Sequence, residues 1–353
     1  MKKLKNDLFI RACKREETER TPIWIMRQAG RYMPEYRAVR GKYDFLTMCK
    51  TPELATEVTL QPIDLIGVDA AIIFSDILVV PEAMGMFLEM HEGKGPIFHK
   101  PIRTEEAAND LKQIDPSKDL KYVLDAISLT KKELNNRVPL IGFSGSPWTL
   151  LTYMVEGRGS KNFSEIKKLI YNNPKLAHSL LDRISVAVAD YLSAQISAGA
   201  DAVQIFDTWG GILSPDDFKE FSLNYIEKVI SLLKKKDEPV IVFAKGVHYA
   251  IKKLAKSGAD VLGLDWTMNI GDVRKEVGKR VALQGNLDPT VLYAPQEKIK
   301  EEVKRVLKSF GKGNGHIFNL GHGVLPDINP ENVKALVNFV KELSPAFHKS
   351  GKK

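Results

Sequence analysis

Two arginines, Arg27 and Arg31, lie four residues apart directly after a short apolar run at residues 22–26. Arginine presents a planar donor fork that can bind a carboxylate or a phosphate through two parallel hydrogen bonds. Two such forks beyond the end of a buried strand suit an anion that carries more than one acid group. The same spacing also permits an ordinary ion pair between Arg31 and Glu35, so the spacing alone leaves both interpretations open.

The composition is that of a globular protein and excludes several other classes. Apolar residues make up 44% and charged residues 27% of the 353 positions, which is typical of a folded domain. No apolar run reaches the roughly 18 residues that a membrane span needs. The apolar stretch at residues 8–12 is too short for the core of a signal peptide. We therefore expect a cytoplasmic protein that does not enter a membrane.

The charged residues and the cysteines narrow the choice of partner. The formal net charge is +8, and six lysines lie in segments 1–5 and 349–353, which we expect to be short basic tails. The sequence holds no zinc-finger, RNA-binding or P-loop pattern, so nucleic acid is not the expected partner, whereas a basic cleft suits a small polyanion. Cys13 and Cys49 belong to no Cys-x-x-Cys pair, so neither a disulfide framework nor a metal site is expected.

Short apolar runs alternate with longer amphipathic runs along the whole chain, and no linker divides it. Strands buried on both faces of a parallel sheet are expected to be continuously apolar. The predicted strands are residues 22–26, 70–74, 139–143, 202–206, 240–243, 261–264, 281–284 and 316–320. The predicted helices are residues 53–66, 174–198, 215–234, 249–256, 273–277, 297–310 and 330–343. Ser146, Ser214 and Asn329 each precede a proline, which is the sequence signal of a helix N-cap.

Eight strands that alternate with helices predict an α/β fold, a single (β/α)8 barrel that takes up residues 1–353. A doubly wound open sheet is the alternative, but the glycine fingerprint of dinucleotide-binding sheets is missing from the sequence. Residues 86–103 are predicted to form a β-hairpin outside the barrel repeat. In a barrel of this kind, the active site lies at the carboxyl ends of the strands.

Polar residues gather directly after the predicted strands, while the strands themselves carry few. Tyr153 lies on a short predicted helix after the third strand. The ring of residues after the strands contains Arg27, Arg31, Ser75, Asp76, Tyr153, Glu156, Asp207, Thr208, Trp209, Lys245, His248, Asp265, Asn286 and His322. Binding residues concentrate on loops that a rigid scaffold holds, although loops are polar everywhere. We therefore predict a functional site at the carboxyl ends of the strands.

Six segments, taken in order along the chain, resemble the motifs of one known family. They are MRQAGRYMPEY at 26–36, FSDILVVP at 74–81, GFSGSPWTLLTYMVEG at 142–157, VQIFDTWGG at 203–211, LQGNLDP at 283–289 and NLGHG at 319–323. Together they resemble the uroporphyrinogen decarboxylase family over nearly the whole chain. The resemblance implies a carboxy-lyase of porphyrin and haem biosynthesis. Its substrate, uroporphyrinogen III, would lose carbon dioxide from four acetate side chains and become coproporphyrinogen III.

The resemblance also implies roles for the charged residues. Arg27 and Arg31 match arginines that contact carboxylates of the substrate. Asp76 matches an aspartate that accepts hydrogen bonds from pyrrole N–H groups and stabilises a cationic intermediate; an N-cap on the following segment is its alternative role. Free arginine is too weak an acid to be an obvious proton donor, and Asp76 is better used as an anion, so the proton donor stays open.

Further family positions are aromatic or hydroxylated. Tyr153 and His322 match residues placed against side-chain carboxylates or the reacting ring, and Tyr36 matches an aromatic position expected to pack against the macrocycle. Thr208 occupies a position where serine is common among relatives, so the hydroxyl is kept and a methyl is added. The resemblance assigns no role to Lys245, His248, Asp265 and Asn286.

The resemblance implies no cofactor and no metal, and it suggests a homodimer. Two alternatives share features of the sequence. Corrinoid- or coenzyme-M-dependent methyltransferases resemble this family but bind zinc through a His-x-Cys pair and a distant cysteine, and the chain has no His-x-Cys. A non-catalytic tetrapyrrole-binding protein would keep the arginines and the apolar pocket but would show no turnover.

Overall fold

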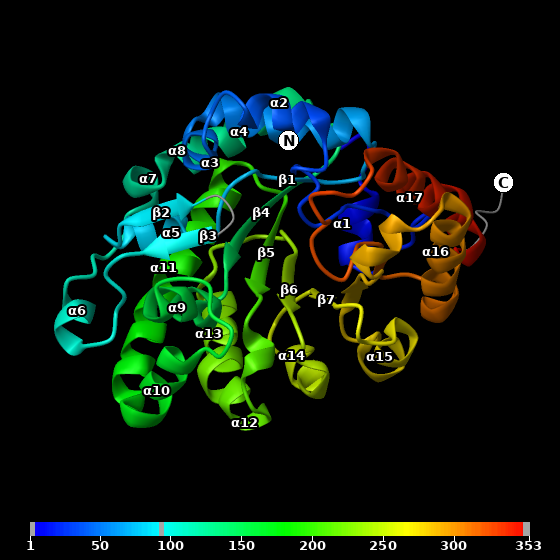
Figure 1. Cartoon of the computed structure of the whole chain (residues 1–353). Coiled ribbons are helices and arrows are strands. Elements are labelled where there is room, and N and C mark those ends of the chain that lie inside the picture. The colour runs from blue at the N-terminus through cyan, green and yellow to red at the C-terminus, as the bar shows by residue number, and fades with distance from the viewer. Residues whose placement is uncertain (1–3, 92–94, 349–353) are drawn as a thin grey trace.

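The computed structural model describes residues 4–91 and 95–348. Parallel strands form one curled seven-stranded sheet, in the order β1-β4-β5-β6-β7-β8-β9 (Figure 1). They are β1 (Ala71–Ile72), β4 (Leu140–Gly145), β5 (Ala202–Asp207), β6 (Val240–Ala244), β7 (Val261–Gly263), β8 (Ala282–Gln284) and β9 (His316–Ile317). Each overlaps a predicted strand, so seven of the eight predictions are confirmed.

The prediction of a strand at residues 22–26 is wrong. Only Ile23 takes part in a parallel bridge, with Phe318 next to β9. On the other side, the backbone N–H of Asp69, just before β1, donates to the carbonyl oxygen of Ile23 at 2.7 Å. The segment thus lies between the two edges of the sheet and touches both without extending either ladder.

Competing side chains explain why this segment does not become a strand. The N–H of Ile25 donates to the Gln28 side-chain oxygen at 3.1 Å, and the amide nitrogen of Gln28 donates to the carbonyl of Ala70 at 3.1 Å. The N–H of Met26 donates to the Asn319 side chain at 3.0 Å. Backbone donors that a ladder would need are therefore satisfied by side chains, which apolar periodicity does not reveal.

Helices surround the outer face of the sheet. The longer ones are α4 (Pro52–Leu65), α8 (Lys121–Leu134), α9 (Pro147–Glu156), α10 (Ser164–Asn172), α11 (Pro174–Ala198), α13 (Asn224–Leu232), α15 (Ile270–Val277), α16 (Gln296–Phe310) and α17 (Pro330–Leu343). The short ones are α1 (Leu8–Cys13), α2 (Pro34–Arg40), α3 (Phe45–Lys50), α5 (Val79–Ala83), α6 (Glu105–Asn109), α7 (Pro116–Asp119), α12 (Pro215–Asp217) and α14 (Ile251–Leu254). The side chains of Ser146, Ser214 and Asn329 accept backbone N–H groups of the helices that follow, as the sequence predicts.

The predicted helix at 215–234 is interrupted. Between α12 and α13 the backbone forms a π-helical segment, Phe218–Leu223. A π turn rotates the residues that follow it relative to a regular helix. Ser222, within this segment, directs its hydroxyl onto Asp207 at the end of β5. The predicted helix at 249–256 likewise begins with a 3-10 turn, His248–Ala250, and continues as α14.

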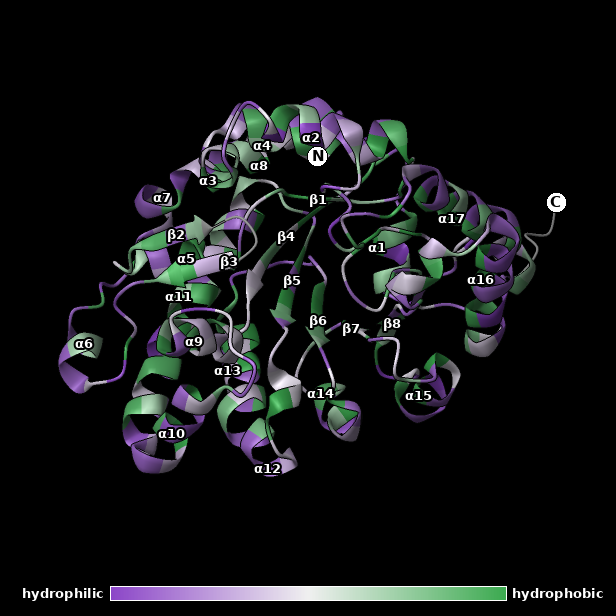
Figure 2. Cartoon of the chain, viewed as in Figure 1, coloured by the Kyte–Doolittle hydropathy of each residue, from purple (hydrophilic) through white to green (hydrophobic). Residues whose placement is uncertain are grey.

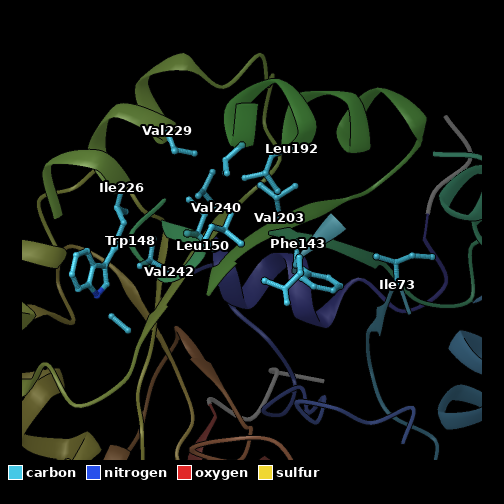
Figure 3. Packing of buried hydrophobic residues seen from close by; sticks show 14 of the residues in the cluster. Ile73, Phe143, Trp148, Leu150, Leu192, Val203, Ile226, Val229, Val240 and Val242 are labelled. Atoms are coloured by element: carbon cyan, nitrogen blue, oxygen red, sulfur yellow. The ribbon is translucent and has the colours of Figure 1, made fainter. Parts of the chain in front are cut away.

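Two apolar layers hold the fold together. Inside the curl, Phe9, Ala12 and Cys13 of α1 pack against side chains from the strands, so α1 covers the amino ends of the sheet. Outside, Val203 of β5 and Val240 of β6 belong to the cluster that packs against α11 and α13 (Figure 3). Covering the amino ends leaves the carboxyl ends, where the loops with polar residues begin, as the open side.

The predicted hairpin at 86–103 is confirmed. Strands β2 (Leu88–His91) and β3 (Gly95–Phe98) pair antiparallel, and their connection lies outside the described residues. Figure 2 shows apolar residues along the central strands and mixed apolar and polar residues along the outer helices. In the described part of the chain, no helix has the length and apolar character that crossing a membrane requires.

Candidate active site

The candidate site lies at the carboxyl edge of the curled sheet. In Figure 1 the arrowheads of β4, β5 and β6 point toward the edge where α9, α12 and α14 begin. Side chains from several loops contribute to this edge, because parallel strands all end on the same side. Three predicted residues lie there within electrostatic range of a fourth, Arg27: they are Asp76, Tyr153 and His322.

Arg27 follows the segment at 22–26 and takes a left-handed backbone conformation with φ 64°. A non-glycine residue adopts this conformation only when the surroundings enforce it. Its side chain lies against Gly323, where a Cβ would come within 2.3 Å of the arginine Cδ. Glycine at 323 is thus required for Arg27 to lie next to His322, and the guanidinium remains exposed to solvent.

Asp76 follows β1 and accepts a hydrogen bond from the N–H of Leu78 at 2.7 Å. Burial raises the pKa of this carboxyl, while the Leu78 N–H and the positive charge of Arg27 oppose the rise. The carboxylate therefore lies in a poorly solvated position with one fixed donor and one nearby cation. Such a group can stabilise positive charge that develops beside it.

Tyr153, on α9, forms an aromatic group with Trp209 and Phe163. Its ring centre is 6.1 Å from that of Trp209, which in turn lies 4.8 Å from the ring of Phe163. Burial raises the pKa of the Tyr153 hydroxyl, and the indole N–H of Trp209 opposes that rise. Within the described residues this buried N–H makes no hydrogen bond of good geometry, so it acts on the Tyr153 hydroxyl as a nearby dipole.

His322 follows β9 and packs edge-on against two rings. The ring centres of Phe243 and Trp266 lie 6.3 Å and 6.5 Å from it. Burial lowers the pKa of His322 to about 4, and the cations Arg27 and Lys245 act in the same direction. The imidazole is therefore neutral at physiological pH, with one nitrogen as donor and the other as acceptor.

The remaining predicted residues are not joined to this group of four. Tyr36 is only 4% exposed and packs against Phe74 with ring centres 5.7 Å apart, so it is part of the core. Arg31 is exposed, and no ion pair to Glu35 forms among residues 4–91 and 95–348. Thr208 is partly buried between the end of β5 and Trp209. Within the described residues, no hydrogen bond or ring contact links these three to Asp76 or His322.

Comparison with known proteins decides the family. The family model described as uroporphyrinogen decarboxylase matches residues 4–343. A protein named uroporphyrinogen decarboxylase from Chloroherpeton thalassium is 59% identical over 352 residues, which are 98% of this chain and 100% of the relative. One of the same name from Chlorobaculum tepidum is 59% identical over 350 residues, with the same coverage of both chains. The chain belongs to the uroporphyrinogen decarboxylase family.

Solved structures with low identity show a shared fold. A structure titled methyltransferase from Methanosarcina mazei has a TM-score of 0.81 at 23% identity, covering 97% of this chain and 99% of its own. A B12-independent methionine synthase from Shewanella has a TM-score of 0.54 at 13% identity, covering 82% and 85%. At these identities the likeness concerns the arrangement of the backbone.

Two of the polar residues that follow strands, Asp265 and Asn286, form hydrogen bonds within the protein. Asp265, after β7, accepts the N–H groups of Gly246 at 2.6 Å and of Thr267 at 2.8 Å. The side-chain amide of Asn286 donates to the carbonyls of Asp265 and Met268 at 2.8 and 2.7 Å. Both residues tie neighbouring loops together beneath the site. His248 is exposed and lies against the ring of Tyr249.

Sequence reasoning missed a buried network around Asp207. Its carboxylate accepts hydroxyl hydrogen bonds from Ser146 at 2.6 Å, Thr149 at 2.9 Å and Ser222 at 2.7 Å. Burial raises the pKa of Asp207 and the three hydroxyl groups oppose it. The network joins the start of α9 and the π-helical segment to the end of β5. It therefore fixes the position of α9, the helix on which Tyr153 lies. The N-cap signal identified Ser146, but nothing in the spacing pointed to its second bond.

The structure offers no ready metal centre among residues 4–91 and 95–348. No group of three or more His, Cys, Asp and Glu side chains comes close enough there to hold an ion. Cys13 and Cys49 are both buried, and burial raises the pKa of each thiol well above its ordinary value. A neutral buried thiol is a poor ligand, because the thiolate is the form that binds metal.

Proposed function

We propose that this chain is a uroporphyrinogen decarboxylase, which removes the four acetate carboxyl groups of uroporphyrinogen III as carbon dioxide to give coproporphyrinogen III. The observation that carries the proposal is the 59% identity with relatives of that name, along their full length. The clustering of a cation, a carboxylate and a neutral imidazole at the carboxyl edge of the sheet supports it.

The reaction needs an electron sink, and the pyrrole itself can serve as one. Protonation of a ring carbon gives a cation. The bond between the side-chain methylene and the carboxylate then breaks, its electron pair forms an exocyclic double bond, and carbon dioxide leaves. A second proton adds to the methylene while the ring releases its extra proton. Each acetate side chain thus exchanges one carboxylate for one proton and becomes a methyl, without a cofactor or a metal.

Asp76 acts as the anion that faces the pyrrole. Its carboxylate accepts pyrrole N–H groups and stabilises the cation formed on protonation, since a preorganised charge in a poorly solvated place is most effective there. Arg27 and the Leu78 N–H favour the ionised form of Asp76 against the effect of burial. Arg27 also directs its donor fork toward a substrate carboxylate, which sets the orientation of the ring.

Tyr153 and His322 complete the contact with the substrate. The buried hydroxyl of Tyr153 and the neutral ring of His322 both offer hydrogen bonds to a carboxylate or to the reacting ring. Arg31 and Thr208 lie at the edge of the site and contact peripheral side chains of the macrocycle. Tyr36 lies in the core and packs against Phe74, two residues before Asp76, so it supports the segment that leads to this carboxylate.

We infer that residues 22–26 close the seven-stranded sheet into a barrel, in the place that an eighth strand would take. Their backbone bonds to Phe318 on one side and to Asp69 on the other support this arrangement. We further propose that the protein works in the cytoplasm as a homodimer. The family resemblance supports both statements, and sedimentation of the purified protein tests the second.

An anaerobic, discontinuous assay tests the activity. Purified protein is incubated with uroporphyrinogen III, and the products are oxidised to porphyrins and separated by their number of carboxylates. We expect complete conversion to coproporphyrinogen III with intermediates that rise and fall. A protein that binds the substrate but never releases carbon dioxide would be a carrier, and the proposal would be rejected.

The same preparation distinguishes the decarboxylase from a zinc methyltransferase. Elemental analysis should find no stoichiometric metal, and activity should survive exhaustive treatment with a chelator. One zinc per chain, with activity lost on its removal and restored on its return, would overturn the mechanism proposed here.

A further inference from the structure

Lys245, Trp266 and His322 meet at the carboxyl edge although they come from three different loops. Lys245 follows β6, Trp266 lies two residues beyond Leu264 after β7, and His322 follows β9. The Lys245 Nζ lies 5.6 Å from the centre of the Trp266 ring. The His322 ring meets the same indole edge-on, with centres 6.5 Å apart and planes at 89°. Trp266 is 38% exposed, so this group opens to solvent.

The ammonium of Lys245 has no counter-ion in the described part of the chain. Other lysines of the same region are paired, as Lys252 of α14 is with Glu276 at 3.2 Å. Asp265, which follows the next strand, already accepts the N–H groups of Gly246 and Thr267. An indole face attracts a cation and leaves the N–H donors of the ammonium available, so Trp266 can hold Lys245 without satisfying its hydrogen bonds.

We propose that Lys245 binds a carboxylate of the substrate, with Trp266 as its platform and His322 beside the same carboxylate. The proposal rests on the proposed function, because that function supplies a substrate with several carboxylates. Lys245 and Trp266 are thereby assigned to substrate binding, a role that neither their sequence spacing nor the family resemblance gave them.

The position of His322 indicates how the contact works. Arg27 approaches the histidine from the side of Gly323, and Lys245 approaches from the loops after β6 and β7. Both cations act on the imidazole, with Asp265 as the opposing anion. Carboxylates bound at Arg27 and at Lys245 would therefore flank His322 and balance the two cations beside it. The bond from Gly246 to Asp265 fixes the backbone beside Lys245 before the substrate arrives.

The test compares three variants under anaerobic conditions: Lys245→Met, Lys245→Arg and Lys252→Met. Lys245→Met keeps the length of the side chain and removes the charge, and we expect the KM for uroporphyrinogen III to rise about 10- to 100-fold, as the loss of one hydrogen bond to a charged group predicts. The value of kcat should change by less than about threefold, since that bond orients the substrate in both the ground and the transition state. Lys245→Arg should stay near wild type, and the exposed control Lys252→Met should be unchanged.

A second measurement separates a binding role from a merely structural one. The His322 ring proton is assigned by its loss in His322→Asn and is followed by NMR as the pH changes. Removing the charge in Lys245→Met should raise the pKa of His322 in the free enzyme, and Lys245→Arg should not. Lys245→Gln replaces Lys245→Met if the latter does not fold, so the measurement does not depend on a single variant.

Turnover by the wild-type protein distinguishes a failure of the Lys245 assignment from a failure of the proposed function. If wild type does not turn over uroporphyrinogen III, the proposed function itself fails. With an active wild type, an unchanged KM in Lys245→Met overturns the assignment of Lys245. Equal losses in Lys245→Met and Lys245→Arg, or in Lys245→Met and Lys252→Met, would overturn it as well, because neither follows from a charge at this position.

Discussion

Replacement of Asp76 by asparagine should separate activity from stability. The amide oxygen can keep the 2.7 Å hydrogen bond from the Leu78 N–H, so the loop after β1 should keep its course. The negative charge is lost, and the amide nitrogen brings donors to a place where the pyrrole N–H groups need acceptors. We therefore expect a folded protein that binds the macrocycle and decarboxylates it poorly.

The size of the effect follows from the position of the carboxylate. Removing one preorganised electrostatic partner of a transition state lowers kcat by about 10²–10³, or roughly 3–4 kcal/mol in the barrier. Stability should change in the opposite sense. Because burial raises the pKa of Asp76 more than Arg27 and Leu78 lower it, the ionised group destabilises the folded state at neutral pH. The thermal midpoint of Asp76→Asn should equal or exceed that of wild type.

The assay is conversion of uroporphyrinogen III under anaerobic conditions, paired with a thermal unfolding curve. Asp115→Asn is the matched control, because Asp115 accepts the N–H of Ser117 at 3.1 Å in the same local geometry but lies on exposed α7. The control should retain full turnover. Turnover of Asp76→Asn within about threefold of wild type, or a lower midpoint together with lost activity, would refute this role for the carboxylate.

Three further predictions concern the rest of the site. Arg27→Lys keeps the charge but loses the donor fork, so partly decarboxylated porphyrinogens should accumulate; a normal rate with a normal product distribution would show that the fork is not used. The His322 ring should titrate near pH 4, because its pKa is lowered to about that value; a proton NMR titration with a midpoint near 6.5 would contradict the burial argument. Asp207→Ala should lower the free energy of unfolding by about 3 kcal/mol, since three buried hydroxyl groups lose their acceptor at about 1 kcal/mol each. Urea unfolding measures this, and Asp207→Asn, which keeps one acceptor oxygen, should lose less.

The sequence predicted the sheet well wherever backbone groups pair with backbone groups. Strands β4, β5 and β6 are mostly apolar, and each is found within two residues of its predicted limits. The segment at 22–26 has the same apolar character but is no strand, because the side chains of Gln28 and Asn319 take its backbone donors. Apolar periodicity indicates burial, and this segment is buried, so the pattern could not distinguish it from a strand that pairs with its neighbours.

The sequence likewise predicted part of the candidate site, and its prediction was incomplete because it did not include local backbone geometry. The strand ends predicted that Arg27, Asp76 and His322 lie at the carboxyl edge, because that edge follows from the topology, and their roles there stay a prediction. The direction in which each side chain points could not be predicted from the strand ends. Arg27 reaches His322 only through a left-handed backbone conformation, and Tyr36 turns into the core from a helix that the strand pattern did not reveal. Both outcomes depend on local backbone geometry that residue types at a spacing leave undetermined.

Three aspartates lie at or after the carboxyl ends of β1, β5 and β7, and they differ in the number of donors already fixed on each carboxylate. Asp207 accepts three hydroxyl groups, and Asp265 accepts two backbone N–H groups and the hydroxyl of Thr267. Asp76 accepts one N–H within the described residues. An ionised carboxylate has room for about four donors. Asp207 and Asp265 are therefore largely used by the protein, whereas Asp76 keeps most of its capacity for a ligand. Since the substrate offers pyrrole N–H groups, the aspartate with the fewest internal bonds is the one suited to receive them.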